Sequence, residues 1–330
     1  MRALQDSLRD SYNRQFKYLR LSLTEVCNFR CSYCLPDGYK SSCSEMPLNE
    51  NEVINLVHAF SELGINKIRL TGGEPTVRQD IVSIVQKIAK IDGIKKIALT
   101  TNGFRLEQLA APLFEAGLTN LNVSVDSLQE ENFLKITGKS YLKKVLVGLE
   151  KAVLVGIPTI KINTVLLKDL NDTELSNYIN LVRKAPISVR FIELMQTGSN
   201  GDYFKKHHLS TKVIDSYLRD CGWYEASKQI TDGPAVEFTH KDYLGRIGII
   251  SPYEKDFCKL CNRLRISSFG KLQLCLFGQG QLSLRNLLQD ADQKEELQQT
   301  ILKSLLLKPV EHDLKSGFTG LTKNLSMIGG

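Results

Sequence analysis

The chain has 330 residues, 42% of them hydrophobic, and a formal net charge of +7. This length predicts about two domains, or one barrel with an extension, and the composition is ordinary for a globular chain with a sizeable core. No stretch approaches the roughly 18 apolar residues that a membrane span needs, and residues 1–10 are too charged for a signal peptide.

We therefore expect a cytoplasmic protein whose cysteines are reduced. The positive charge would suit a nucleic acid, but the sequence has no basic run and no interleaving of basic and aromatic residues. A small polyanion such as a nucleoside triphosphate accounts for the charge equally well.

Short β-rich runs alternate with helical patterns along the first 200 residues. Apolar residues repeat on one helical face over residues 49–64, 79–90 and 141–156, and Gly64 and Gly156 suit the ends of two of these helices. Strands that alternate with helices predict an α/β fold with parallel strands and right-handed crossovers. The predicted strands are residues 18–24, 67–72, 96–102, 120–126, 159–167 and 188–195.

Six such units are fewer than the eight of a full TIM barrel, so we expect an open, partial (β/α)6 barrel. The chain changes character after about residue 200, where helices over 211–219 and 291–307 flank irregular strands. We therefore divide the chain into a barrel domain, residues 1–200, and a C-terminal extension, residues 201–330, that closes the mouth of the barrel.

Three cysteines lie close together at Cys27, Cys31 and Cys34. Their C-x3-C-x2-C spacing supplies three thiolates in eight residues, which suits a [4Fe–4S] cluster with one iron left open. Zinc prefers four protein ligands, and three cysteines cannot all form disulfides with one another. The arrangement resembles that of radical S-adenosylmethionine (SAM) enzymes, in which the open iron binds SAM and an electron from the cluster cleaves it.

A second set of cysteines, Cys258, Cys261 and Cys275, has the spacing C-x2-C-x13-C. Alone, it resembles a zinc ribbon that lacks its fourth ligand, because His312 lies too far along the chain to complete it. Three thiolates favour a second cluster with an open iron, and zinc stays the alternative. We interpret Cys43 and Cys221 as ordinary thiols.

Polar or special residues follow several of the predicted strands. Gly72 to Pro75 form the run GGEP, in which paired glycines allow a close backbone approach and Glu74 can orient an ammonium group. Lys161 lies within a strand, where a buried lysine is costly unless it meets an anion. Each residue alone could be a turn, a cap or core packing, but several such strand ends together predict one shared cavity.

The motifs together resemble the molybdenum cofactor biosynthesis protein A family, the GTP 3',8-cyclases of the radical SAM superfamily. The resemblance covers almost the whole chain in order. Its most specific parts are the second cysteine set with Arg263 and Arg265, and the terminal Gly329-Gly330. The matching segments are residues 19–36, 67–80, 99–103, 121–128, 161–166, 190–198, 257–277 and 327–330.

The resemblance implies a role for each matching residue. The first cysteine set would hold the cluster that binds SAM, and the second would hold a cluster whose open iron binds the guanine of GTP. The SAM site would be lined by Tyr33, Gly73, Ser124 and Met195. The GTP contacts would be Arg20, Arg69, Thr100, Lys161, Arg190, Arg263, Leu264 and Arg265. The catalytic residues would be Arg20, Arg263, Arg265, Gly329 and Gly330, with the two glycines threading into the active site.

The implied reaction is a radical cyclisation that opens molybdenum cofactor (molybdopterin) biosynthesis. A 5'-deoxyadenosyl radical from SAM would remove the ribose 3' hydrogen of GTP, and the ribose carbon would attack C8 of guanine. The closed radical would then be reduced by one electron and protonated to give (8S)-3',8-cyclo-7,8-dihydroguanosine 5'-triphosphate. The implied partners are an electron donor and cyclic pyranopterin monophosphate synthase, which would take the product. We expect neither a nucleic acid nor a membrane as a partner. We expect the protein to be a monomer or a homodimer.

Two short segments depart from the family pattern: Glu25-Val26 stands where Asp-Arg is common, and Asn13-Arg14-Gln15 where Gly-Arg-Pro is common. We expect neither segment to touch a cluster ligand.

Two other function classes stay open. One is a radical SAM maturase that modifies peptides and carries an auxiliary cluster, and the other is a zinc or nucleic-acid-binding module without enzymatic activity.

Overall fold

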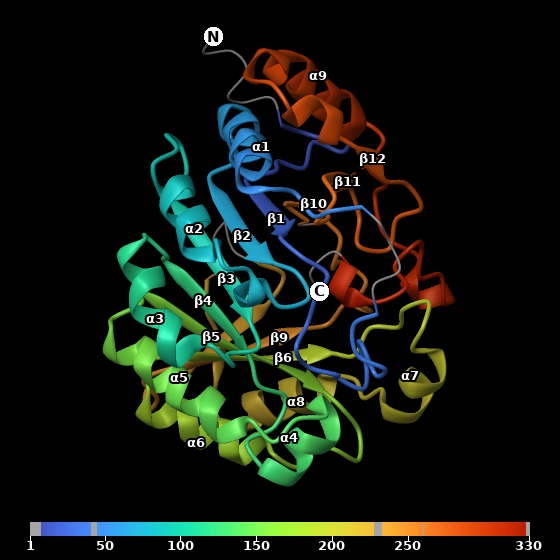
Figure 1. The fold of residues 1–330 in the computed structure, drawn as a ribbon. Helices are drawn as coiled ribbons and strands as arrows, with labels where there is room; N and C mark the ends of the chain where they lie inside the picture. Colours follow the sequence, from blue (N-terminus) through green and yellow to red (C-terminus); the bar gives the residue numbers. More distant parts are fainter. Residues whose placement is uncertain (1–7, 41–44, 228–232, 260, 328–330) are drawn as a thin grey trace.

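The structure is a computed structural model, and it describes residues 8–40, 45–227, 233–259 and 261–327 (Figure 1). None of the helices in these ranges combines the length and the apolar composition that a membrane-spanning helix requires.

Six parallel strands lie side by side in the order of the sequence, which confirms the six predicted strands. Their registers are continuous: Arg20 of the first strand pairs with Arg69 of the second, and Asn122 of the fourth pairs with Lys161 of the fifth. The strands are β1 (Tyr18–Ser22), β2 (Lys67–Thr71), β3 (Lys96–Thr101), β4 (Asn120–Ser124), β5 (Thr159–Leu166) and β6 (Ser188–Glu193).

Helices cover the outer side of these strands (Figure 1). The three predicted helices are confirmed as α1, α2 and α5, and each buries an apolar face; α1 buries Val53, Leu56, Val57 and Phe60. Gly64 and Gly156 follow α1 and α5 with φ values of +93° and +83°, the left-handed conformation that ends helices. These helices are α1 (Glu50–Glu62), α2 (Ile81–Ala89), α3 (Leu106–Glu115), α4 (Glu130–Thr137), α5 (Leu142–Leu154) and α6 (Leu175–Lys184).

The C-terminal part of the chain extends the same sheet at both edges. β10 (Arg263–Ile266) pairs in parallel with β1, and β9 (Arg246–Ile250) pairs in parallel with β6. The sheet order is therefore β12-β11-β10-β1-β2-β3-β4-β5-β6-β9-β8-β7. The outer strands are antiparallel: β7 (Tyr224–Glu225), β8 (Val236–Thr239), β11 (Lys271–Gln273) and β12 (Leu282–Ser283).

The helices of this part lie beyond the β/α units. α8 (Lys212–Asp220) confirms the helix predicted over 211–219, whereas the segment 291–307 divides into a short 3₁₀ turn, η4 (Ala291–Gln293), and α9 (Lys294–Leu305). The described residues also form one further helix, α7 (Gly201–His207), and four further 3₁₀ turns, η2 (Pro75–Val77), η3 (Arg285–Leu288), η5 (Leu314–Ser316) and η6 (Leu325–Met327).

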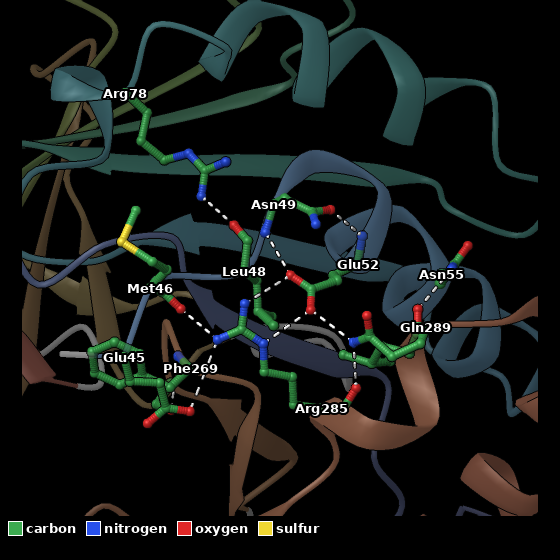
Figure 2. Close-up of polar contacts among 12 residues, drawn as sticks. Glu45, Met46, Leu48, Asn49, Glu52, Asn55, Arg78, Phe269, Arg285 and Gln289 are labelled. Atoms are coloured by element: carbon green, nitrogen blue, oxygen red, sulfur yellow. Dashed lines mark hydrogen bonds and ion pairs between the residues drawn. The ribbon is translucent and has the colours of Figure 1, made fainter.

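One buried carboxylate joins the two parts of the chain (Figure 2). Glu52 closes the capping box of α1, because Asn49 N donates to Glu52 Oε2 at 2.8 Å and Glu52 N donates to Asn49 Oδ1 at 2.9 Å. Oε1 of Glu52 also accepts from Arg285 Nε at 2.9 Å and from Gln289 Nε2 at 2.8 Å. Burial would raise the pKa of Glu52, but these hydrogen bonds hold it below its usual value. The start of α1 and the segment around η3 therefore both form hydrogen bonds with the carboxylate of Glu52.

Candidate active site

Two adjoining cavities lie along the inner side of the parallel strands. We call the first the cysteine-loop cavity; it has a volume of about 160 Å³ and lies at the carboxyl ends of the strands. We call the second the cationic cavity; it has a volume of about 260 Å³ and extends along the strands themselves. The cavities adjoin because Thr100, Asn163, Ile192 and Met195 line both.

Cys27, Cys31 and Cys34 lie in the loop after β1 and line the cysteine-loop cavity as free thiols. The loop turns tightly, since Cys34 N donates to Cys31 O at 2.9 Å, and Phe29 anchors it in the core. Burial raises the pKa of Cys27 to about 11 and that of Cys34 to about 12. Three soft donors, all on the wall of one cavity, form a donor set that suits an iron–sulfur cluster.

The paired glycines after β2 pack directly against this loop. Gly73 N donates to Thr24 O at 2.7 Å, and Glu74 N donates to Val26 O at 2.8 Å. A Cβ atom on Gly73 would lie 2.4 Å from Glu25 O and 2.5 Å from Val26 O. The glycine is therefore required by the backbone of the cysteine loop itself, and the departure at Glu25-Val26 forms part of that contact.

The residues that the resemblance assigns to SAM, namely Tyr33, Gly73, Ser124 and Met195, all line the cysteine-loop cavity. Tyr33 OH donates to Asp126 Oδ2 at 2.8 Å, and burial raises the pKa of Asp126 to about 6. The carboxylate of Glu74 accepts hydrogen bonds from Thr76 Oγ1, Thr101 Oγ1 and Asn102 N. Glu74 therefore also has a structural role, which the sequence did not indicate.

The cationic cavity is lined by basic side chains from six strands, β1, β2, β3, β5, β6 and β10, and from the segment after α9. Arg263 and Arg265 alternate along β10 and both reach it, as their spacing predicts. Burial, together with Arg263, lowers the pKa of Arg265 to about 10, and Nη1 of Arg265 is buried without a partner among the described residues. No carboxylate belongs to the described lining of this cavity. The basic lining residues are Arg20, Lys67, Arg69, Lys96, Lys161, Arg190, Arg263, Arg265 and Lys308.

Cys258, Cys261 and Cys275 line the same cavity and are also free thiols. Burial would raise the pKa of Cys261, but Arg263 and Lys308 beside it bring that pKa down to about 6. This cationic setting favours thiolates. The second cysteine set thus shares a cavity with the basic residues and the first set does not, which the order of the sequence alone does not reveal.

His312, which lies far along the chain from the second cysteine set, also lines the cationic cavity. Its ring packs near Phe257 and Phe277, with centroid distances of 5.9 and 5.3 Å, and its Nε2 is buried without a partner among the described residues. Nevertheless, no three His, Cys, Asp or Glu side chains in the described ranges converge as the ligands of one metal ion must. The same holds for both cysteine sets, so the choice between zinc and a cluster rests on family membership and not on this geometry.

Arg14 corrects one of our expectations. We expected the departure at Asn13-Arg14-Gln15 to touch no cluster ligand, but Arg14 Nη1 donates to the carbonyl oxygen of Cys258 at 3.2 Å. The same guanidinium binds the carbonyl oxygens of Pro309 and Val310, each at 2.6 Å. A long-range contact of this kind leaves no periodic signal in the sequence.

Most of the other residues assigned to GTP line the cationic cavity, and one of them does not. Arg20, Arg69, Thr100, Lys161 and Arg190 line the cationic cavity. Leu264 packs its side chain in the hydrophobic core, so only its backbone could reach a ligand.

Cys221 is an exposed thiol, as expected for a cysteine outside both sets. Cys43, Gly329 and Gly330 lie outside the described residues.

The described end of the chain reaches the cysteine-loop cavity. Leu325 and Ser326 line it together with Cys34, and their backbone groups act to lower the pKa of the Cys34 thiol, against the effect of burial. Upstream, Gly198 N donates to Thr322 O at 3.0 Å and Ser199 N donates to Lys323 O at 3.1 Å. The segment before the terminal glycines is therefore docked against the protein.

Comparison with known proteins agrees with this arrangement. Residues 21–182 match the family model described as Radical SAM superfamily, and residues 187–314 match the one described as Molybdenum Cofactor Synthesis C. A GTP 3',8-cyclase of Psychromonas ingrahamii is 51% identical over 327 residues, which cover 99% of this chain and 96% of that protein. A GTP 3',8-cyclase of Tolumonas auensis is 51% identical over 323 residues, with 98% and 96% coverage.

The chain belongs to the GTP 3',8-cyclase family. It is a radical SAM enzyme of molybdenum cofactor biosynthesis, and its cofactors are SAM and two [4Fe–4S] clusters. The partial barrel is shared with Streptococcus suis SuiB bound to S-adenosylmethionine, at a TM-score of 0.60 and 13% identity over 83% of this chain and 64% of that one. A second SuiB structure matches at a TM-score of 0.55 and 12% identity, with 87% and 68% coverage. At this identity, the SuiB structures support the fold alone.

Proposed function

We propose that this protein converts GTP to (8S)-3',8-cyclo-7,8-dihydroguanosine 5'-triphosphate, the first step of molybdenum cofactor biosynthesis. The observation that carries the proposal is one cysteine triplet in each of two adjoining cavities, of which the second is lined by arginines and lysines. A triphosphate needs several cations in an enclosed site, and arginine forks grip phosphate oxygens with two donors. The names of the two cyclase relatives support the same substrate.

In this proposal, Cys27, Cys31 and Cys34 hold the SAM-binding cluster, and Cys258, Cys261 and Cys275 hold the second cluster. When bound, the first cluster supplies the electron that cleaves SAM to methionine and the 5'-deoxyadenosyl radical that takes the ribose 3' hydrogen. The protein itself positions the reactants. SAM and GTP would meet at the wall that the two cavities share, which is formed by Thr100, Asn163, Ile192 and Met195.

The basic residues of the cationic cavity would hold GTP. Arg263 and Arg265 lie beside the second cysteine set, so we assign them to the guanosine end that meets this cluster. The remaining contacts are assigned to Arg20, Arg69, Thr100, Lys161, Arg190 and the backbone of Leu264. Tyr33, Gly73, Ser124 and Met195 are assigned to SAM, and Gly329 and Gly330 to the completion of the active site.

The finer parts of the proposal concern partners and location. A separate electron donor would reduce the clusters, and cyclic pyranopterin monophosphate synthase would consume the product. We propose the cytoplasm as the location, because reduced cysteines and iron–sulfur clusters persist there, and a monomer or a homodimer as the working state. The division at residue 200 is likewise a proposal.

An anaerobic assay tests the proposed substrate. Reconstituted protein is incubated with SAM, a reductant and each of the four nucleoside triphosphates in turn, and the products are separated by liquid chromatography and mass spectrometry. We expect only GTP to yield a cyclised product, and its mass should equal that of GTP because the hydrogen lost from C3' is balanced by the electron and proton that the closed radical takes up. Equal consumption of all four nucleotides, or of none of them, would overturn the proposal.

A further inference from the structure

A carboxylate outside the described cavity lining contacts two of the lining cations. Oε1 of Glu237 accepts from Arg190 Nε at 2.9 Å and lies 3.3 Å from Lys161 Nζ, and Arg190 Nη2 makes a short contact to the same oxygen. Oε2 of Glu237 accepts from Ser188 Oγ at 2.8 Å. All three charged side chains are largely buried, with 21% of Lys161, 11% of Arg190 and 17% of Glu237 exposed.

The sheet register creates this contact. Gly248 of β9 pairs with Arg190 of β6 on one side and with Glu237 of β8 on the other. Because Gly248 has no side chain, Glu237 can reach across β9; a Cβ atom there would lie 3.0 Å from Arg190 Cγ and 3.5 Å from Glu237 Cδ. Lys161 pairs with Ser188, so both join the same group from β5 and β6. The C-terminal part of the chain thereby reaches two cations of the β/α part.

Glu237 is not part of the described lining of the cationic cavity, whereas Lys161 and Arg190 are. The carboxylate occupies Nε and Nη2 of Arg190 and leaves Nη1, which lies 3.8 Å from the Cβ position of Gly233, another lining residue. It engages Lys161 Nζ as a single acceptor, which leaves further N–H donors of that ammonium group. Both cations therefore keep donors for a ligand in the cavity.

Lys161 needs this neighbour, because the other charges around it are positive. Arg190 of β6 and Lys67 of β2 face it, Lys96 of β3 lines the same cavity, and β4 presents the neutral Asn122 at the same register position. Burial lowers the pKa of Lys161 to about 8, Arg190 and Lys67 act in the same direction, and Glu237 opposes them. Without the carboxylate, the ammonium group would lose its proton at a lower pH.

We propose that Glu237 is a positioning residue for the polyanionic substrate: it keeps Lys161 charged and fixes the guanidinium of Arg190, so that both present cationic donors to the cationic cavity. The inference rests on the proposed function, because the polyanion in question is the triphosphate of GTP. It adds a residue from β8 to the cations that β5 and β6 present to the cavity.

The test is the pH dependence of GTP binding to Glu237→Gln. The substitution keeps the size of the side chain and removes its charge. Anaerobic calorimetry on reconstituted protein would measure the Kd for GTP at about pH 6 and about pH 8, each as a ratio to wild type, which cancels the titration of GTP itself. If the substitution lowers the pKa of Lys161 by about one unit, the ratio of the variant's Kd to the wild-type Kd should be about fivefold larger at the higher pH than at the lower pH. A ratio that stays constant, or tighter GTP binding by the variant at both pH values, would overturn the inference.

Three controls separate a positioning role from misfolding and from failure of the substrate assignment. In a Lys161→Arg background the guanidinium does not titrate, so adding Glu237→Gln should leave the ratio independent of pH. Glu225 lies on the neighbouring strand β7 and is half exposed, so Glu225→Gln should leave the Kd for GTP at its wild-type value at both pH conditions. Glu237→Asp retains the charge, so its ratio should not depend on pH. If wild type itself does not bind GTP, the proposed function fails; if wild type binds and the ratio is flat, only the role of Glu237 fails.

Discussion

Nη1 of Arg14 donates a hydrogen bond of 3.2 Å to the carbonyl oxygen of Cys258, a residue 244 positions further along the chain. The same side chain forms a buried ion pair with Asp10, with Nε 2.6 Å from Oδ2, and reaches the carbonyl oxygens of Pro309 and Val310. The loop before β1 therefore holds both the second cysteine set and the segment after α9 in place.

Replacing Arg14 by Gln should destabilise the protein and release iron from the second site. The side chain of Asp10 is fully buried, and removing one partner of a buried ion pair costs about 3–5 kcal/mol. Urea unfolding and iron analysis would measure the two effects. Lys40→Gln serves as the control, because its pair with Asp37 is exposed and should contribute little. Unchanged unfolding and full iron in the Arg14 variant would contradict this account.

The two cysteine sets should account for two separate clusters. Replacing Cys27, Cys31 and Cys34 by alanine should halve the iron of anaerobically reconstituted protein and abolish SAM cleavage. Replacing Cys258, Cys261 and Cys275 should also halve the iron but leave some uncoupled SAM cleavage, because the first set lines a different cavity. Iron, sulfide and zinc analyses check this, and zinc at the second site would contradict it.

Arg263 and Arg265 should matter more for GTP than for SAM. Both line the cationic cavity, and neither lines the cysteine-loop cavity. A charge-assisted hydrogen bond is worth about 1.5–3 kcal/mol, so alanine at either position should weaken GTP binding about tenfold or more. SAM binding, measured on the same samples, should stay within about twofold. Unchanged GTP affinity in both variants would mean that β10 does not contact the nucleotide.

Much of this arrangement is predictable from the sequence, and the reasons for the failures are physical. The six strands and the helices α1, α2, α5 and α8 follow from periodicity and glycine positions, which are local signals. The cysteine sets and Arg263 with Arg265 follow from spacing. Glu237, Lys308 and His312 were missed as site residues because strand pairing and the path after α9 bring them there, and these are long-range relationships.

The end of the chain should act in two distinguishable ways. Deleting Gly329 and Gly330, which lie outside the described residues, should leave clusters, SAM binding and GTP binding nearly intact and nearly abolish the cyclised product. Deleting residues 325–330 should also perturb the first cluster, because Leu325 and Ser326 line the cysteine-loop cavity together with Cys34. Electron paramagnetic resonance of the reduced protein would show a changed signal only in the longer deletion. Full activity without the two glycines would make the tail an ordinary frayed end.

The most direct test of the central claim is the fate of the ribose 3' hydrogen. Anaerobic turnover with GTP deuterated at C3' should yield 5'-deoxyadenosine that carries one deuterium, and GTP deuterated at C2' should yield none, as read by mass spectrometry. Deuterium transfer from C2', or unlabelled 5'-deoxyadenosine together with a cyclised product from the 3'-deuterated substrate, would contradict the proposed radical cyclisation.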